Sequence, residues 1–161
     1  MGTYHKSIIE LISFILRKGH EYLEDVDSGN AYDKILRNYH QINLRGEKVY
    51  RNISLMQTNY RFTKEAWKNK GDLKELYFEH LIPIKIIKDD LRNLIGTDFT
   101  DNDIRCILDK TEIVVLTRNQ AKRLDEEFKS NLPDNGINRL QIMNYEIEER
   151  TENNSIFESN K

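Results

Sequence analysis

Apolar residues in this chain recur at intervals of three and four over several stretches, and helix-starting and helix-ending residues separate these stretches. The first stretch, over 7–23, carries Ile8, Leu11, Ile12, Ile15, Leu16 and Leu23. Such spacing places apolar side chains on one face of an amphipathic helix. Comparable stretches cover 30–45, 63–80, 83–95, 100–108 and 117–132. The chain is therefore predicted to be mainly helical.

Residues with capping or terminating preferences stand at the ends of these stretches. Asn30, Thr63 and Thr100 each precede an apolar pattern and are predicted N-caps. Thr117-Arg118-Asn119-Gln120 has the spacing of a capping box. Pro83 suits the first turn of a new helix, and Gly71-Asp72 could divide the 63–80 stretch.

Two segments favour strands instead of helices. The β-branched run at 112–116 is the clearest strand pattern, and 140–147 is a second candidate that could pair with it. Residues 47–62 show no sustained period and are predicted to form a loop or short hairpin. The expected fold class is mainly α (α+β), a compact bundle of about five or six helices with a small two-stranded β element near the C-terminus.

Length and hydropathy set the expected organisation. The 161 residues suit one domain, predicted over 1–148, followed by an acidic, disordered tail over 149–161. No run approaches the roughly 18 apolar residues of a membrane span, and no signal-peptide pattern is present, so a cytoplasmic protein is expected. Cys106, the single cysteine, lies between Ile104 and Ile107 and is expected to be a buried, inert thiol.

Charge is unevenly distributed along the chain. Seven Lys or Arg residues face two acidic residues over 45–70, whereas five Glu face one Arg and one Lys over 146–161. Aromatic residues lie among the cations, as in surfaces that bind nucleic acids or acidic proteins. The candidate binding residues are Arg45, Lys48, Tyr50, Arg51, Tyr60, Arg61, Lys64, Trp67 and Lys68.

The string Phe78-Glu79-His80-Leu81-Ile82-Pro83 resembles the first segment of the HNH nucleases. The resemblance implies that His80 would be the general base that activates water, with Glu79 beside it and a bound divalent metal. No histidine follows His80, so the final metal ligand of that family has no counterpart here. The alternative is a structural pair at the kink before Pro83; on that interpretation no cofactor is expected.

A longer pattern resembles small bacterial and phage proteins. It joins Glu79-His80-x-x-Pro83 to the Val-Val-Leu-Thr strand, Leu132-Pro133 and Arg139, and it implies no activity. The abundance of Lys, Asn and Ile also suggests a bacterial or phage origin.

Three functions stay open at this point. The favoured one is a non-enzymatic interaction protein with a protein partner, such as an inhibitor or accessory factor in phage or bacterial defence and counter-defence. The second is a degenerate HNH-like nuclease that uses His80. The third is a nucleic-acid-binding protein without catalysis. No membrane partner is expected, and the sequence leaves the oligomeric state open.

Overall fold

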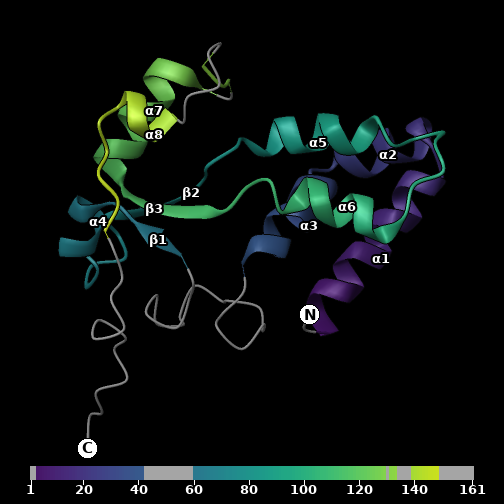
Figure 1. The fold of residues 1–161 in the computed structure, drawn as a ribbon, viewed down its shortest axis with the longest axis horizontal. Coiled ribbons are helices and arrows are strands. Elements are labelled where there is room, and N and C mark those ends of the chain that lie inside the picture. The colour runs from purple at the N-terminus through teal and green to yellow at the C-terminus, as the bar shows by residue number, and fades with distance from the viewer. Residues whose placement is uncertain (1–2, 42–59, 130, 134–138, 149–161) are drawn as a thin grey trace, which may run out of the picture. The chain divides into compact units, whose positions relative to one another are not determined.

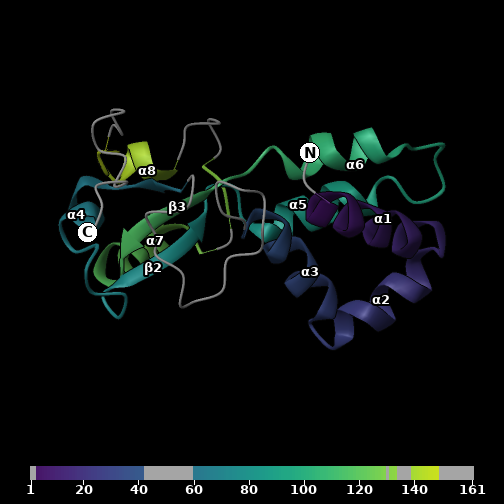
Figure 2. The same cartoon turned by 90° about the horizontal axis from the view of Figure 1, so that it is seen from below.

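The computed structural model describes residues 3–41, 60–129, 131–133 and 139–148, and these form a mainly α (α+β) fold, as predicted (Figures 1 and 2). The helices are α1 (Thr3–Arg17), α2 (His20–Ser28), α3 (Ala31–His40), α4 (Lys64–Lys68), α5 (Ile84–Arg92), α6 (Asp101–Leu108), α7 (Arg118–Phe128) and α8 (Arg139–Ile142). The strands are β1 (Arg61–Phe62), β2 (Leu76–His80) and β3 (Ile113–Thr117).

The chain divides into two compact units, each built from two separate stretches of sequence. The described residues within 1–50 and 82–112 form the first unit, and those within 51–81 and 113–161 form the second. Each unit has its own buried apolar residues. The single domain expected over 1–148 stays a prediction, and the tail expected over 149–161 lies outside the described residues.

The first unit is helical and packs α1, α2, α3, α5 and α6 around one apolar core. Fully buried side chains from each of these helices meet there: Ile12, Leu23, Leu36, Ile87, Leu91, Ile104 and Leu108. Polar contacts add to this packing, since the Tyr39 hydroxyl donates to Asp109 Oδ1 at 2.8 Å. Among the described helices, none has both the length and the apolar character to cross a membrane.

The second unit is built on a three-stranded sheet with the order β1-β3-β2. β1 runs parallel to β3 and β2 runs antiparallel to it, so that Phe62 and Phe78 both align with Val115. One face of the sheet packs with α4 through Val115 and Ala66, and the other packs with α7 and α8 through Val114 and other residues. All five residues of β3 are buried, as expected for a central strand covered on both faces.

Two expectations about the β structure are wrong. Residues 76–80 form strand β2 instead of the second half of a helix, and β3 pairs with β1 and β2 instead of with 140–147. The sheet therefore has three strands, two of them from the middle of the chain. Residues 139–142 form the short helix α8, and Ile147 makes only an isolated antiparallel bridge to Thr63.

The helix predicted over 7–23 is also divided. α1 ends at Arg17, and Gly19 adopts a φ of 93° before α2 begins. This left-handed region is readily accessible only to glycine, so the break is encoded by a single residue.

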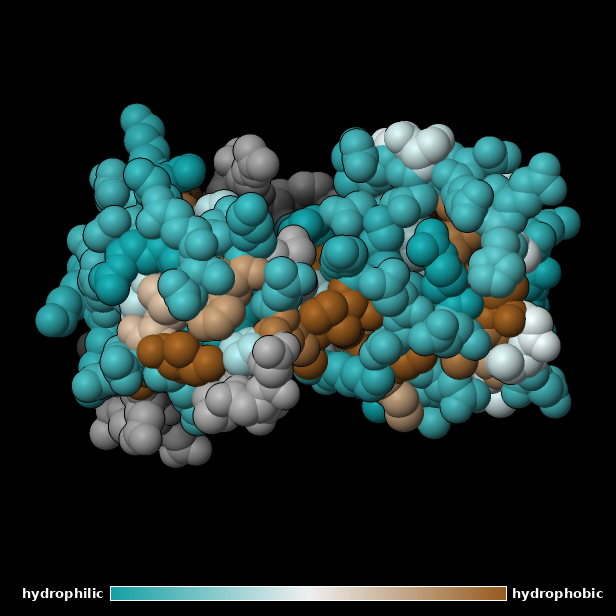
Figure 3. Space-filling view, turned by 90° about the horizontal axis from the view of Figure 1, so that it is seen from above, coloured by the Kyte–Doolittle hydropathy of each residue, from teal (hydrophilic) through white to brown (hydrophobic). Residues whose placement is uncertain are grey.

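The exposed surface carries most of the polar residues. Figure 3 shows apolar side chains, in brown, as small groups among mainly hydrophilic ones. Cys106 is exposed, which corrects the expectation of a buried thiol. The buried residues of α6 are Ile104, Ile107 and Leu108. Cys106 is two positions from Ile104 and two from Leu108, so its side chain points away from the face that those two residues bury.

Candidate functional site

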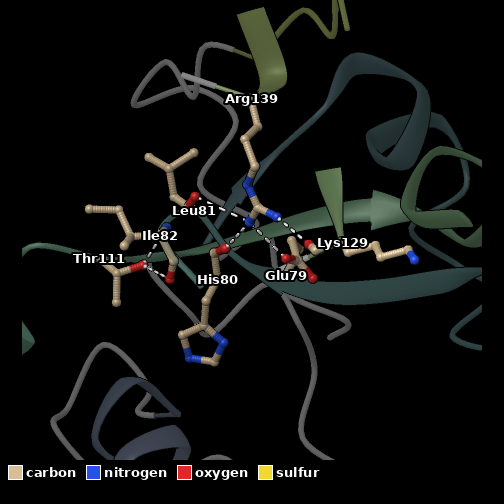
Figure 4. Close-up of polar contacts among 7 residues, drawn as sticks. All are labelled: Glu79, His80, Leu81, Ile82, Thr111, Lys129 and Arg139. Atoms are coloured by element: carbon tan, nitrogen blue, oxygen red, sulfur yellow. Dashed lines mark hydrogen bonds and ion pairs between the residues drawn. The ribbon is translucent and has the colours of Figure 1, made fainter. Parts of the chain in front are cut away.

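Glu79 and His80, the pair singled out in the sequence, are consecutive residues of strand β2. Successive side chains of a strand point to opposite faces of its sheet. Glu79 aligns with Val114, which packs with α7 and α8, whereas His80 aligns with Ile113, which packs on the α4 side. The two side chains are therefore separated by the sheet, and Figure 4 shows them pointing in different directions.

Glu79 forms an ion pair with Arg139, which lies in α8 and is 2% exposed. The Arg139 Nη2 atom donates to Glu79 Oε1 at 2.9 Å, to the His80 carbonyl at 2.8 Å and to the Leu81 carbonyl at 3.2 Å (Figure 4). Its Nη1 atom donates to the Lys129 carbonyl at 3.2 Å. Arg139 thus joins α8 to the end of β2 and to the end of α7.

These contacts make Arg139 a structural centre of the second unit. A buried guanidinium requires a counter-charge and acceptors for its N–H groups; Glu79 and three carbonyl oxygens supply these to Nη1 and Nη2, whereas Nε has no hydrogen-bond partner among the described residues. The Glu79 carboxylate is directed at this cation, while His80 is 4% exposed on the other face. The geometry does not place Glu79 and His80 in a shared acid–base site.

A second polar contact lies within the first unit, at Ile82, where the chain enters that unit after β2. The Thr111 hydroxyl accepts a hydrogen bond from the Ile82 amide at 2.9 Å and donates to the Ile82 carbonyl at 3.0 Å (Figure 4). Pro83 is then the N-cap residue of α5, so the helix predicted to begin at this proline is confirmed. His80 is therefore the last residue of a strand that precedes a helix, where the sequence had predicted helix on both sides.

The expected basic and aromatic surface is described only in part. Arg45, Lys48, Tyr50 and Arg51 lie outside the described residues. Tyr60 is 6% exposed, and burial raises the pKa of its hydroxyl to about 12. Tyr60 therefore offers no open ring face to a ligand.

Trp67 is half-buried and packs edge-to-face against Phe62, with ring centroids 5.2 Å apart. The Lys70 ammonium lies 4.7 Å from the centroid of the Trp67 ring, a cation–π contact. Lys70 belongs to the basic segment but was not among the candidate binding residues. Trp67 thus has one ring contact to the core and one to a cation.

Lys64 and Lys68 are exposed on α4, and half-buried Lys70 follows the helix; we call these three cations, together with Trp67, the α4 basic surface. Arg61 of β1 is also exposed, but it aligns with Val114, on the face of the sheet that packs with α7 and α8. Lys64 Nζ contacts Glu146 Oε2 at 2.6 Å. The hydrogen bond and the charge of Lys64 lower the pKa of the Glu146 carboxyl. A carboxylate from the acidic end of the chain is therefore bound at this surface.

The backbone around Glu146 is held against the same segment. The Lys64 amide donates to the Glu146 carbonyl at 2.9 Å, and the Glu148 amide donates to the Phe62 carbonyl at 2.7 Å. Together with the bridge between Thr63 and Ile147, these bonds place residues 146–148 antiparallel to residues 62–64. The charge pattern identified both segments, but their adjacency is a tertiary contact with no local signal.

Beside this surface, two helix N-termini are linked by one buried side chain. Thr63 caps α4 and Thr117 caps α7 with the predicted capping box. Gln120 Oε1 accepts from the Thr63 hydroxyl at 2.7 Å and from the Thr117 amide at 3.0 Å. This network fixes α4 relative to β3 and so positions Lys64, Trp67 and Lys68.

Within the part of the chain that the structure describes, there is no group of three or more His, Cys, Asp or Glu side chains arranged to hold a metal ion. No protein-family model, curated protein or solved structure matches this chain. The α4 basic surface and the Arg139 centre are therefore interpreted from their own geometry.

Proposed function

We propose that this protein is a non-enzymatic interaction module whose α4 basic surface binds an acidic segment of a partner protein. The contact between Lys64 and Glu146 carries the proposal, because it shows a carboxylate held at this surface at 2.6 Å. The segment bearing Glu146 is extended and bonded through its backbone to 62–64. An acidic, extended stretch of a partner is the kind of ligand that matches this arrangement.

The aromatic residues favour a protein partner over single-stranded nucleic acid. Proteins that bind single strands stack bases on open ring faces. Tyr60 is buried, and Trp67 contacts Phe62 on one side and Lys70 on another. Tryptophan is, in contrast, one of the residue types enriched at the energetic centres of protein interfaces.

Capture from a bacterial lysate tests this proposal, with the full chain immobilised and half of the lysate treated with nuclease. The test variant is Lys64→Ala/Lys68→Ala. The matched control is Lys34→Ala/Lys85→Ala, which removes the same charge from exposed positions in α3 and α5. Poly-glutamate and a thymidine oligonucleotide serve as defined anionic probes at low and high salt.

We expect protein bands that survive nuclease treatment, weaken in Lys64→Ala/Lys68→Ala and persist in the control. Poly-glutamate should bind the unmodified chain and the control more tightly than it binds Lys64→Ala/Lys68→Ala. Its binding should fall as salt rises because exposed charges are screened. Bands that disappear with nuclease, together with tight oligonucleotide binding, would establish nucleic acid as the ligand. Equal binding by both double variants would contradict the assignment of the surface.

The proposal includes a cytoplasmic location and a role as an inhibitor or accessory factor in phage or bacterial defence. Composition supports the origin, since Lys, Asn and Ile are abundant. Plating efficiencies of a phage panel on a bacterial host that expresses the chain test the role. Unchanged plating for every phage, with and without the host's defence systems, would contradict it.

A further inference from the structure

Helix α1 has apolar side chains on two sides. Ile12 and Ile15 are buried in the core of the first unit. Leu11 is 44% exposed and Phe14 is 48% exposed, and Tyr22 of α2 is 40% exposed. Phe14 and Tyr22 form an edge-to-face pair with ring centroids 6.0 Å apart. The first unit therefore presents a continuous aromatic and aliphatic ridge outside its core.

The ridge residues of α1 have the spacing of a helix–helix seam. Ser7, Leu11 and Phe14 of α1, and Lys18 directly after the helix, follow one another at intervals of four, three and four, which matches the a and d positions of a heptad. All four are exposed. A seam of this kind is complementary to another helix lying along it, because knobs of one helix fill the holes of the other.

We propose that this ridge is the contact between two copies of the chain, with α1 of one copy packed antiparallel against α1 of the other. A twofold axis near Phe14 makes the interface self-complementary, as in most homodimers. It sets Glu10 of each copy opposite Lys18 of the other. A parallel arrangement would instead set Glu10 beside Glu10 and Lys18 beside Lys18.

Both charged groups are available for this pairing. Glu10 contacts Lys6 at 3.7 Å, and the two side chains are 56% and 70% exposed, so this contact is weak and solvated. Lys18 extends over the Phe14 ring, with Nζ 5.4 Å from its centroid. Its aliphatic stem therefore adds apolar surface to the ridge while its ammonium lies at the edge.

Sedimentation velocity of the full chain tests the proposal from about 1 μM to about 1 mM, the range of weak and moderate interfaces. We expect a concentration-dependent species of twice the 19.2 kDa chain mass. Leu11→Ser/Phe14→Ser should raise the dimer dissociation constant about tenfold or more. Leu73→Ser, at a residue 46% exposed in the second unit, is the control and should leave it unchanged. Circular dichroism melts check that each variant is folded.

Charge reversal tests the antiparallel arrangement separately. Glu10→Lys and Lys18→Glu should each weaken the dimer, and the double variant should restore it, because the opposite charges exchange places. A chain that stays monomeric at every concentration would overturn the proposal. So would a dimer that Leu11→Ser/Phe14→Ser leaves intact, or one that the double reversal fails to restore.

Discussion

The Arg139 guanidinium and the Glu79 carboxylate, sixty residues apart in sequence, form an ion pair of 2.9 Å that connects α8 to strand β2. The cation is 2% exposed and also donates to three backbone carbonyl groups. Because these acceptors come from the end of β2 and from Lys129 after α7, the side chain cross-links α8 to two other segments of the second unit.

Replacing Arg139 with alanine should therefore destabilise the second unit strongly. Breaking a buried ion pair costs about 3–5 kcal/mol, because the remaining charge and acceptors lose their partner. Urea denaturation followed by circular dichroism measures the loss. Arg37→Ala is the control, since its pair with Asp33 lies on the helix surface and is worth about 0.5 kcal/mol. Equal losses in the two variants would contradict the cross-linking role.

Thr117→Ala should cost more stability than Thr100→Ala, although both residues begin a capping box. Loss of a threonine cap costs about 0.5–2 kcal/mol. Thr117 is 5% exposed and belongs to the buried network around Gln120, whereas the Thr100 contacts are exposed. We expect the loss in free energy of unfolding, measured by urea denaturation, to lie near the upper end of this range for Thr117→Ala and near the lower end for Thr100→Ala. The reverse order would show that the Gln120 network adds nothing to the cap.

Stability should fall at alkaline pH, in part through Tyr60. Its pKa rises from 10.0 to about 12 on folding because the hydroxyl is buried. The folded state thus favours the protonated hydroxyl. The contribution of Tyr60 to the free energy of unfolding is therefore fully present below pH 10 and is lost as pH rises from 10 to 12. A shift of this size corresponds to about 2–3 kcal/mol. Burial also raises the pKa of Tyr32 and Tyr39, so the effect is isolated by comparing Tyr60→Phe with the unmodified chain. Identical pH profiles of the two would contradict it.

The Cys106 thiol should react with a thiol reagent in the native state. It is exposed on α6, and it is the single cysteine of the chain. We expect one equivalent of 5,5′-dithiobis(2-nitrobenzoate) to react without denaturant, at a rate that urea increases little. A thiol that reacts only after unfolding would place Cys106 inside the first unit. The variant Cys106→Ser supplies the blank.

Local signals predicted much of the helical structure. Thr100 precedes α6 as predicted, Thr117 begins α7 with the predicted capping box, and Pro83 precedes α5. The residues that form each of these signals lie within one helical turn of each other, so the signals can be recognised from the sequence without knowledge of tertiary contacts. Asn30 precedes α3 as predicted, but its side chain makes no capping bond because the residue is left-handed, with φ 56°.

Long-range contacts account for most of what the sequence did not reveal. Residues 76–80 fit a helical pattern, and they become a strand because β3 supplies pairing for each of them. The partner of Glu79 is Arg139, and the partner of Lys64 is Glu146. None of these pairings can be read from spacing, since each joins residues separated by more than 30 positions.

The order of the sheet, β1-β3-β2, also determines when it can form. β3 is the shared neighbour of the other two strands, yet it is the last of the three to leave the ribosome. Until residue 117 emerges, β1 and β2 have no strand of this sheet to pair with, and Tyr77 and Phe78 are exposed even in the completed structure. Nascent chains are therefore expected to expose aggregation-prone strand edges during this interval. Translation pauses that fall after β2 has left the ribosome and before β3 has left it should consequently lower the yield of folded protein.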